Sequence, residues 1–545
     1  MSLQFITGNS GNGKTKYLFN RIVKEAKANP RDNYLVIVPE QFTMQTQRQL
    51  VDLSENKAIM NIDVLSFKRL AYRVFDELGI TNLTVLEETG KNLVLRKLAA
   101  QEADKLGVIG RNLNRIGYIS EVKSLLSELV QYNISPEELG RYIASGMLSD
   151  TLSDKLKDVL VLYEAFEKFM QDKYITAEEI LNVLSNVAEE SAILRNSVIA
   201  FDEFTGFTPI QNQLIKKLFV ISKKIYVTLT IDCREDIFKS RGMQELFDMP
   251  KRTVKSLTEM AAFYGIEVEE PIILDKNYRL AENEELSFME QQLFRKRRCS
   301  FKKVPKHIHI DCLRDPKQEL TKIARRINEL VRNENLRYRD IAIVTGDVNI
   351  YAGYVREIFD KYNIPYFIDA TQEILFHPFI EFIRSIPDIA AQNFSADAVF
   401  RFLRCGFTEL SASEIDVLEN YVLACGVRGK SAWDKKWVRL PKHKAGYDLE
   451  LLNQSREYIM ELLKPVYQVF SDKKSTVKDY VLAIYKLIVL LDIPDKLAKK
   501  EQALLDAGDQ TASKEYGQIY KIVMQLFEKY VAVAGGGRIG GEGLY

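Results

Sequence analysis

The sequence contains few of the residues that hold metal clusters or covalent cross-links. Only five cysteines and four histidines occur among its 545 residues, and no two cysteines form a C-x-x-C pair. Neither a zinc site nor a disulfide framework is therefore predicted, which fits a protein of the reducing cytosol.

Long apolar runs and a strong net charge are also lacking. No uninterrupted run of 18 apolar residues and no signal peptide is recognisable, so we expect a soluble, cytoplasmic protein without a membrane partner. The 76 Lys and Arg residues are balanced by 75 Asp and Glu residues, a net charge of +1. Any surface that binds nucleic acid must therefore be local. The length predicts several domains.

A phosphate-binding motif stands at the start of the chain. Leu3–Thr7 predicts a buried strand, the next eight residues match the Walker A pattern G-x-x-x-x-G-K-[ST], and helical spacing follows from Tyr17. Glycines let successive backbone N–H groups point at phosphate oxygens in front of a helix N-terminus. Lys14 is expected to reach the β- and γ-phosphates, and Thr15 to hold Mg²⁺. The predicted nucleotide-binding residues are Gly8, Asn9, Ser10, Gly11, Asn12, Gly13, Lys14 and Thr15. The alternative is a glycine-rich turn that binds nothing.

Strand and helix patterns alternate through the N-terminal part, which predicts a parallel α/β sheet. The stretch 87–194 is helical almost throughout, and we expect it to be inserted into a sheet domain built from 1–86 and 195–294. Apolar runs predict further strands of that sheet at 34–38, 62–65, 197–201 and 225–231.

The second half of the chain repeats this order. Residues 295–306 contain seven Lys or Arg and are expected to form a basic linker. A second, partial α/β half is predicted over 307–377, and a second helical insertion over 378–534. Within 307–377 the pattern predicts strands at 307–312, 341–345 and 366–368 and helices at 317–333 and 351–362. The last eleven residues, 535–545, include six glycines and are predicted to be flexible, as at a truncation point.

An acidic pair follows one of the predicted strands. Asp202 and Glu203 come directly after the apolar run 197–201, in the form of a Walker B motif. Beside a Walker A strand, Asp202 is expected to hold Mg²⁺, and Glu203 to orient the attacking water as the catalytic carboxylate. The alternative is an acidic pair that caps the helix after Pro209.

Two later motifs resemble those of superfamily 1 helicases of the UvrD type. Asp232–Phe238 lies where that family has G-D-x-x-Q-x-I-Y, and Asn277–Arg279 is similar to its N-Y-R motif. The resemblance implies the UvrD-like helicase architecture, an α/β fold of P-loop, RecA-like parallel sheet domains with large helical insertions. It also implies that Tyr278 stacks on adenine and that Arg279 reaches the γ-phosphate. By position, Gln41, Ser66 and Phe67 correspond to its DNA-contacting loops.

Four shorter motifs resemble those of one particular family within this group. Pro39–Gln41, Phe201–Pro209, Pro365–Asp369 and Ile374–Pro378 are similar to the AddB family, and the likeness runs to about residue 530. AddB proteins are the B subunits of bacterial AddAB ATP-dependent helicase–nucleases, which process double-strand DNA ends for recombinational repair. The resemblance implies ATP and Mg²⁺ as cofactors, and an AddA-like subunit, DNA ends and single-stranded DNA as partners.

The chain also departs from these families. Glu235 stands where motor helicases have Gln, so this carboxylate is expected to repel the γ-phosphate that the motor residue senses. A late arginine motif is not recognisable, and the nuclease segment of AddB cannot be placed. The 4Fe–4S cluster of that family is not expected here, because the cysteine spacings do not fit it.

These departures shape the expected function. We expect that the chain alone neither unwinds nor degrades DNA, and that the helical segment after Pro378 contacts a partner subunit. The rival functions are a self-sufficient superfamily 1 translocase and a non-catalytic DNA-binding scaffold with a relic P-loop.

Two basic stretches are candidates for contact with DNA. One is 295–306, for which a solvated linker is the alternative. The other is 428–444, where Lys and Arg residues surround Trp433 and Trp437. Phosphate contacts combined with aromatic stacking hold single strands without sequence readout. The alternative for the two tryptophans, spaced i and i+4, is the core of a helix.

Overall fold

The chain divides into two compact units, Met1–Ile308 and His309–Tyr545. The structure is a computed structural model that describes residues 1–80, 85–110, 117–171, 174–295, 299–369, 374–441, 447–472 and 474–534. Several parts of the predicted basic and flexible segments lie outside the described residues: Lys296–Arg298, Lys442, Lys444 and the tail 535–545.

A parallel sheet forms the centre of the first unit. Its strand order is β3-β2-β6-β7-β1-β8, with β9 also paired to β1, and every pair is parallel. The α/β fold predicted from the alternating pattern is thereby confirmed, although the sequence pattern does not predict the two last strands. The strands are β1 (Ser2–Gly8), β2 (Tyr34–Ile37), β3 (Ile62–Leu65), β6 (Val198–Phe201), β7 (Lys224–Thr230), β8 (Glu267–Val268) and β9 (Ile272–Leu274).

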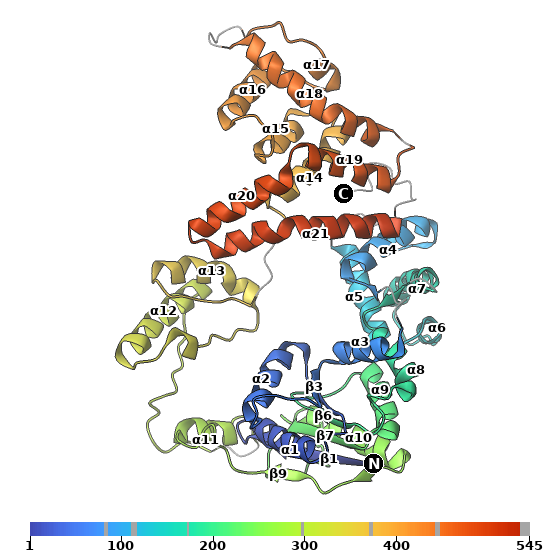
Figure 1. Cartoon of the computed structure of the whole chain (residues 1–545), viewed down its shortest axis with the longest axis vertical. Coiled ribbons are helices and arrows are strands. Elements are labelled where there is room, and N and C mark those ends of the chain that lie inside the picture. The colour runs from blue at the N-terminus through green and yellow to red at the C-terminus, as the bar shows by residue number, and fades with distance from the viewer. Residues whose placement is uncertain are drawn as a thin grey trace. The chain divides into compact units, whose positions relative to one another are not determined.

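Helices cover both faces of this sheet (Figure 1). Successive side chains of a strand point to opposite faces, so Phe5 packs on one side and Ile6 on the other. The side of Ile6 is covered by α1 (Lys14–Ala28) and α2 (Thr43–Leu53). The side of Phe5 is covered by α3 (Phe67–Leu78), α8 (Ile180–Val187), α9 (Pro209–Ile221) and α10 (Asp248–Phe263).

More helices lie between β3 and β6 in the chain, as the helical pattern of 87–194 predicts. A short parallel pair, β4 (Val85–Leu86) with β5 (Ile175–Thr176), brackets most of them. The helices are α4 (Glu88–Gln101), α5 (Tyr118–Gln131), α6 (Pro136–Ala144) and α7 (Asp150–Met170). The first unit also contains α11 (Glu284–Gln292), close to its end.

Helices form nearly all the regular structure described in the second unit. The two helices predicted within 307–377 are present as α12 (Pro316–Asn333) and α13 (Val348–Lys361). The helical stretch predicted after Pro378 contains α14 (Pro378–Ala391), α15 (Ala396–Arg404), α16 (Ala412–Cys425), α17 (Lys430–Asp434), α18 (Leu449–Ser471), α19 (Val477–Leu490), α20 (Ile493–Asp506) and α21 (Gln510–Ala534). A large apolar core joins these helices.

The three strands predicted at 307–312, 341–345 and 366–368 are not strands, and this prediction is wrong for the described residues 299–369. The segments carry the apolar residues typical of strands, but none of them is paired in a ladder with a neighbour. Val344 is 93% exposed and Phe367 is 89% exposed. A cavity of 960 Å³ opens between α12, α13 and the segments 341–345 and 364–369.

Candidate functional site

The glycine-rich loop joins β1 to α1 in a backbone conformation that favours glycine. Gly11 and Gly13 have φ angles of 90° and 81°, which favour glycine. A Cβ atom at Gly11 would lie 2.7 Å from Asn277 Oδ1, and one at Gly8 would lie 2.6 Å from the carbonyl oxygen of Leu274. Residues 274–277 thus pack directly on the loop, and only glycine fits at these two positions.

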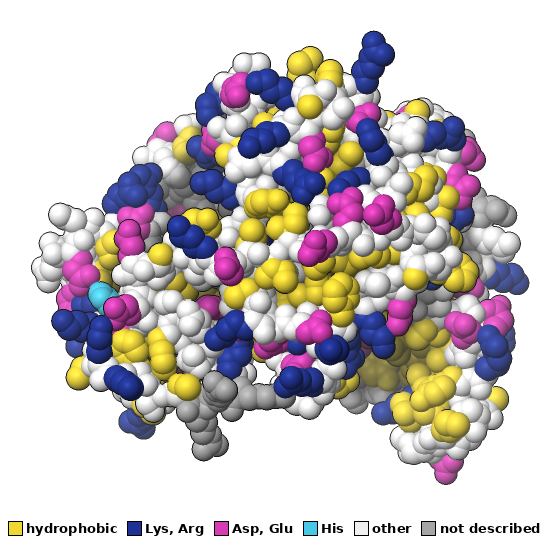
Figure 2. All heavy atoms as spheres, turned by 90° about the horizontal axis from the view of Figure 1, so that it is seen from below, with side chains coloured by type: hydrophobic (Ala, Val, Ile, Leu, Met, Phe, Trp, Pro, Cys, Tyr) yellow, Lys and Arg dark blue, Asp and Glu magenta, His cyan; other side chains and the backbone are white. Residues whose placement is uncertain are grey.

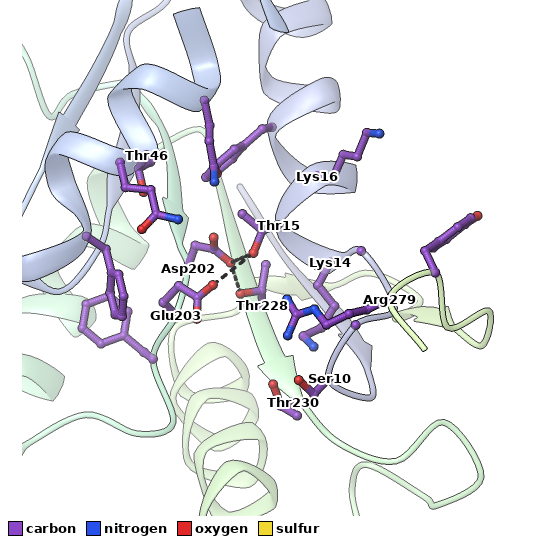
Figure 3. Close-up of a pocket in the computed structure, with 18 of the residues that line it drawn as sticks. Ser10, Lys14, Thr15, Lys16, Thr46, Asp202, Glu203, Thr228, Thr230 and Arg279 are labelled. Atoms are coloured by element: carbon purple, nitrogen blue, oxygen red, sulfur yellow. Dashed lines mark hydrogen bonds between the residues drawn. The ribbon is translucent and has the colours of Figure 1, made fainter. Parts of the chain in front are cut away.

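Lys14, the first residue of α1, lies folded over the loop. Its Nζ donates hydrogen bonds to the carbonyl oxygens of Gly8 and Asn9, both at 3.0 Å. Burial lowers the pKa of the Lys14 ammonium, while the nearby carboxylates of Glu203 and Asp202 act in the opposite direction. The lysine lines a cavity of 740 Å³, large enough for a small ligand, which runs from Arg279 across the loop to Thr46 on α2 (Figure 3).

The acidic pair lies next to Thr15 on the wall of this cavity (Figure 3). The Thr15 hydroxyl lies 3.4 Å from Asp202 Oδ1 and 3.3 Å from Glu203 Oε1. Asp202 is only 1% exposed, and burial raises the pKa of its carboxyl group. Its Oδ1 accepts a hydrogen bond from the Thr228 hydroxyl, whereas its Oδ2 has no partner among the described residues. A hydroxyl beside a carboxylate with one uncommitted oxygen is a donor set that fits Mg²⁺.

The backbone of Glu203 is unusual for a residue with a side chain. Its φ angle is +64°, in the left-handed region that non-glycine residues rarely adopt. Such conformations cluster at functional sites. Asp202 does not cap the helix after Pro209: Thr208 caps that helix by accepting a hydrogen bond from Gln211 N.

The Asn277–Arg279 segment closes the other side of the loop. Asn277 Nδ2 donates to the Ser10 carbonyl oxygen at 2.9 Å, and the Tyr278 N–H donates to that of Gly11 at 3.0 Å. Arg279 lines the cavity with Lys14. Tyr278 is 66% exposed, with Lys276 Nζ 5.1 Å from its ring centroid. A cation and an open aromatic face thus stand beside the loop.

Glu235 forms an ion pair outside the cavity. Repulsion of a γ-phosphate by this carboxylate stays a prediction. Glu235 Oε2 lies 2.6 Å from Nζ of Lys251, a buried residue of α10, and Glu235 does not line the cavity. The glutamate is therefore neutralised by an ion pair away from the loop.

The predicted DNA-contacting residues of the first unit differ in accessibility. Gln41 is exposed, whereas Ser66 and Phe67 are buried. The Ser66 hydroxyl caps α3 by accepting from Arg69 N, and the Phe67 ring stacks on Phe201 at 5.8 Å. The last two side chains hold the fold together and offer no surface to a nucleic acid.

The two tryptophans belong to the core of the second unit. Trp433 is 0% exposed and Trp437 is 6% exposed, and their ring centroids lie 5.2 Å apart. Trp437 Nε1 donates to the Ala432 carbonyl oxygen at 3.0 Å. Buried rings cannot stack on bases, so the structure favours the core alternative, although Trp437 lies beyond α17 and not on the same helix as Trp433.

Basic residues are interspersed with acidic ones. Arg295, in the predicted linker, is partly buried, with its Nε 3.0 Å from Asp232 Oδ2, and Lys303 pairs with Glu284. Figure 2 likewise shows Lys and Arg mixed with Asp and Glu across the face in view.

No helix among the described residues has the length and apolar character needed to cross a bilayer.

The sequence patterns do not predict some of the residues that line the cavity. Thr228 on β7 supports Asp202, and Gln45, Thr46 and Gln49 of α2 line the far end of the cavity. Two threonines, Thr228 and Thr230, interrupt the mostly apolar run 225–231, and they are the available signal for Thr228. The α2 residues carry no motif and are found only through the fold.

Known proteins resemble this chain along nearly its whole length. Relatives named as the B subunit of an ATP-dependent helicase/deoxyribonuclease align with 98–99% of this chain: 38% identity in Lachnoclostridium phytofermentans, 32% in Caldanaerobacter subterraneus subsp. tengcongensis and 31% in Clostridium acetobutylicum. The chain spans about half the length of these curated relatives, 47% of each. The family model described as ADDB, N-terminal, matches residues 5–290, more than half of the 545 residues. This chain therefore belongs to the AddB family.

Proposed function

We propose that this chain binds ATP·Mg²⁺ and DNA as one subunit of a cytoplasmic helicase–nuclease that processes double-strand DNA ends for recombinational repair. The observation that carries the proposal is the convergence of the glycine-rich loop, Lys14, Thr15 and the acidic pair around one cavity. The family membership and the names of the relatives support it. An AddA-like subunit, DNA ends and single strands are the proposed partners.

Six side chains that line the cavity have distinct roles in this proposal. Backbone N–H groups of the loop and Lys14 bind the phosphates, and Thr15 and Asp202 hold Mg²⁺. Bound Mg²⁺ neutralises the negative charge that develops on the phosphates. Glu203 orients water, while Arg279 stabilises phosphate charge and Tyr278 offers its exposed ring to the base.

The ion pair of Glu235 favours the subunit function over the self-sufficient motor. A motor must convert the state of the γ-phosphate into movement, so a side chain at this position should contact the phosphate. Glu235 is instead held by Lys251, outside the cavity. We infer that ATP is bound here and that unwinding is driven by the partner subunit.

ATP turnover by the purified chain separates the three functions. A subunit that depends on a partner binds ATP, but it turns ATP over slowly, with little stimulation by single-stranded DNA, and displaces no strand alone. DNA-stimulated turnover with processive strand displacement would instead identify a self-sufficient motor. Absence of ATP binding in calorimetry would identify a scaffold with a relic P-loop. Digestion of DNA by the chain alone would reveal an unrecognised nuclease site.

A further inference from the structure

Asn9 connects the glycine-rich loop to helix α11. Its buried side chain makes two hydrogen bonds: Nδ2 donates to Glu290 Oε1 at 2.8 Å, and Oδ1 accepts from the Cys233 N–H at 2.9 Å. The Walker A pattern allows any residue at this position. Phosphate binding alone therefore does not explain why an amide bridges the loop to α11 and to the turn after β7.

The opposite end of α11 holds the chain that leaves the first unit. Glu285 is buried, and its two carboxylate oxygens accept hydrogen bonds from Lys306 N at 2.7 Å and His307 N at 2.8 Å. These residues directly precede the end of the unit at Ile308. One short helix thus contacts the glycine-rich loop through Glu290 and the exit of the chain through Glu285.

Phosphates would disturb this arrangement at Asn9. Lys14 Nζ donates to the carbonyl oxygens of Gly8 and Asn9, each at 3.0 Å. A triphosphate competes for the same ammonium group, since charge-assisted hydrogen bonds to anions are stronger than those to neutral carbonyls. Once Lys14 turns to the phosphates, the Asn9 carbonyl oxygen loses the ammonium and keeps only the Asn12 N–H as a donor, at 3.2 Å. The Asn9 side chain then follows any resulting shift of its backbone.

We propose that Asn9 and Glu290 are positioning residues through which a bound nucleoside triphosphate sets how firmly α11 holds residues 306–307. The inference rests on the proposed ATP site and adds a regulatory output to it. Occupancy of the loop is transmitted along α11 to the segment by which the chain leaves the first unit. The ligand is the nucleoside triphosphate of the proposed site, whose phosphate oxygens would compete with the two loop carbonyls for Lys14.

Hydrogen exchange on the full chain tests the output. The amides of α11 and of residues 299–308 are compared with and without Mg²⁺ and a non-hydrolysable ATP analogue, with α16 as the internal reference. We expect nucleotide to change exchange about threefold or more in the first two segments and not in α16, because exchange reports local opening.

Exchanging the amide of Asn9 and the carboxylate of Glu290 tests whether the coupling runs through this hydrogen bond. Asn9→Asp keeps an acceptor for the Cys233 N–H but sets a second carboxylate against Glu290, and should weaken nucleotide binding about tenfold and abolish the exchange response. Adding Glu290→Gln supplies an amide donor to the new carboxylate and should restore both. Gln291→Ala is the matched control, because this exposed residue of the same helix directs its side chain to Ser287 Oγ and does not line the cavity beside the loop.

The outcomes separate the two proposals. No nucleotide binding by the wild-type chain would refute the ATP site itself. Binding without an exchange response in α11 and 299–308 would refute only the coupling, as would an Asn9→Asp protein that Glu290→Gln fails to restore. Circular dichroism checks folding, and if Asn9→Asp does not fold, Glu290→Ala breaks the same link from the helix side with the same expected loss.

Discussion

Replacing Lys14 by alanine should weaken ATP binding about 10- to 100-fold. The structure gives two reasons to attribute this loss to phosphates and not to general damage. Nζ donates to two loop carbonyls, which are neutral acceptors, and burial lowers the pKa of its ammonium group, so the cation is poorly compensated. Phosphate oxygens would supply that compensation through charge-assisted hydrogen bonds.

The magnitude follows from the value of one hydrogen bond to a charged group. Such a bond contributes about 1.5–3 kcal/mol, and each 1.4 kcal/mol corresponds to about a tenfold change in affinity. The free energy of unfolding of the nucleotide-free protein should change by much less than this. The substitution removes two hydrogen bonds to carbonyl oxygens, but it also removes the cost of burying a charged ammonium group, and the two effects offset each other.

Isothermal titration calorimetry with ATP and Mg²⁺ measures this effect. Lys24→Ala is the matched control, since Lys24 is an exposed lysine of the same helix and does not line the cavity. Equal affinities of the Lys14→Ala and Lys24→Ala proteins would show that the loop is not the nucleotide site.

Three further predictions concern other side chains. Asp202→Asn should remove most of the Mg²⁺ dependence of ATP binding, measured by titration with and without the metal, because the buried carboxylate is the proposed ligand. Trp433→Ala should lower the free energy of unfolding by about 3–5 kcal/mol in denaturant titrations and leave the DNA affinity of folded protein unchanged, because the ring is core and not a stacking platform. The stability contribution of His377 should be complete above pH about 6.5 and fall as the pH drops below that value. Burial lowers the pKa of His377, so the unfolded chain takes up the proton first, and protonation also removes the Nδ1 acceptor of the Phe379 N–H. Denaturant midpoints of wild type and His377→Gln at pH 7.5 and 5.5 check this, since the variant should lose less stability on acidification.

The position of the glycine-rich loop is predictable from local sequence. The spacing of three glycines, Lys14 and Thr15 fixes a loop between a strand and a helix, and a parallel sheet brings the carboxyl end of β6 to the same edge. Asp202 and Thr15 are therefore expected to meet, although 187 residues separate them.

Contacts between distant residues without a motif are not predictable in this way. The partner of Glu235 is Lys251 on the following helix, and no spacing rule connects the two. The spacing of Trp433 and Trp437 in the sequence is the same whether the rings are buried or exposed. Their burial depends on how α18 and its neighbours pack. The apolar run 341–345 has the composition of a strand, but a strand exists only where another segment pairs with it.

The unpaired segments 341–345 and 366–368 have a consequence for the behaviour of the isolated polypeptide. Each presents backbone donors and acceptors together with apolar side chains such as Val344 and Phe367. Segments of this kind template intermolecular β-pairing, the first step towards amorphous or fibrillar aggregates. We therefore expect the isolated chain to aggregate through these two short segments, which lie far in sequence from the glycine-rich loop.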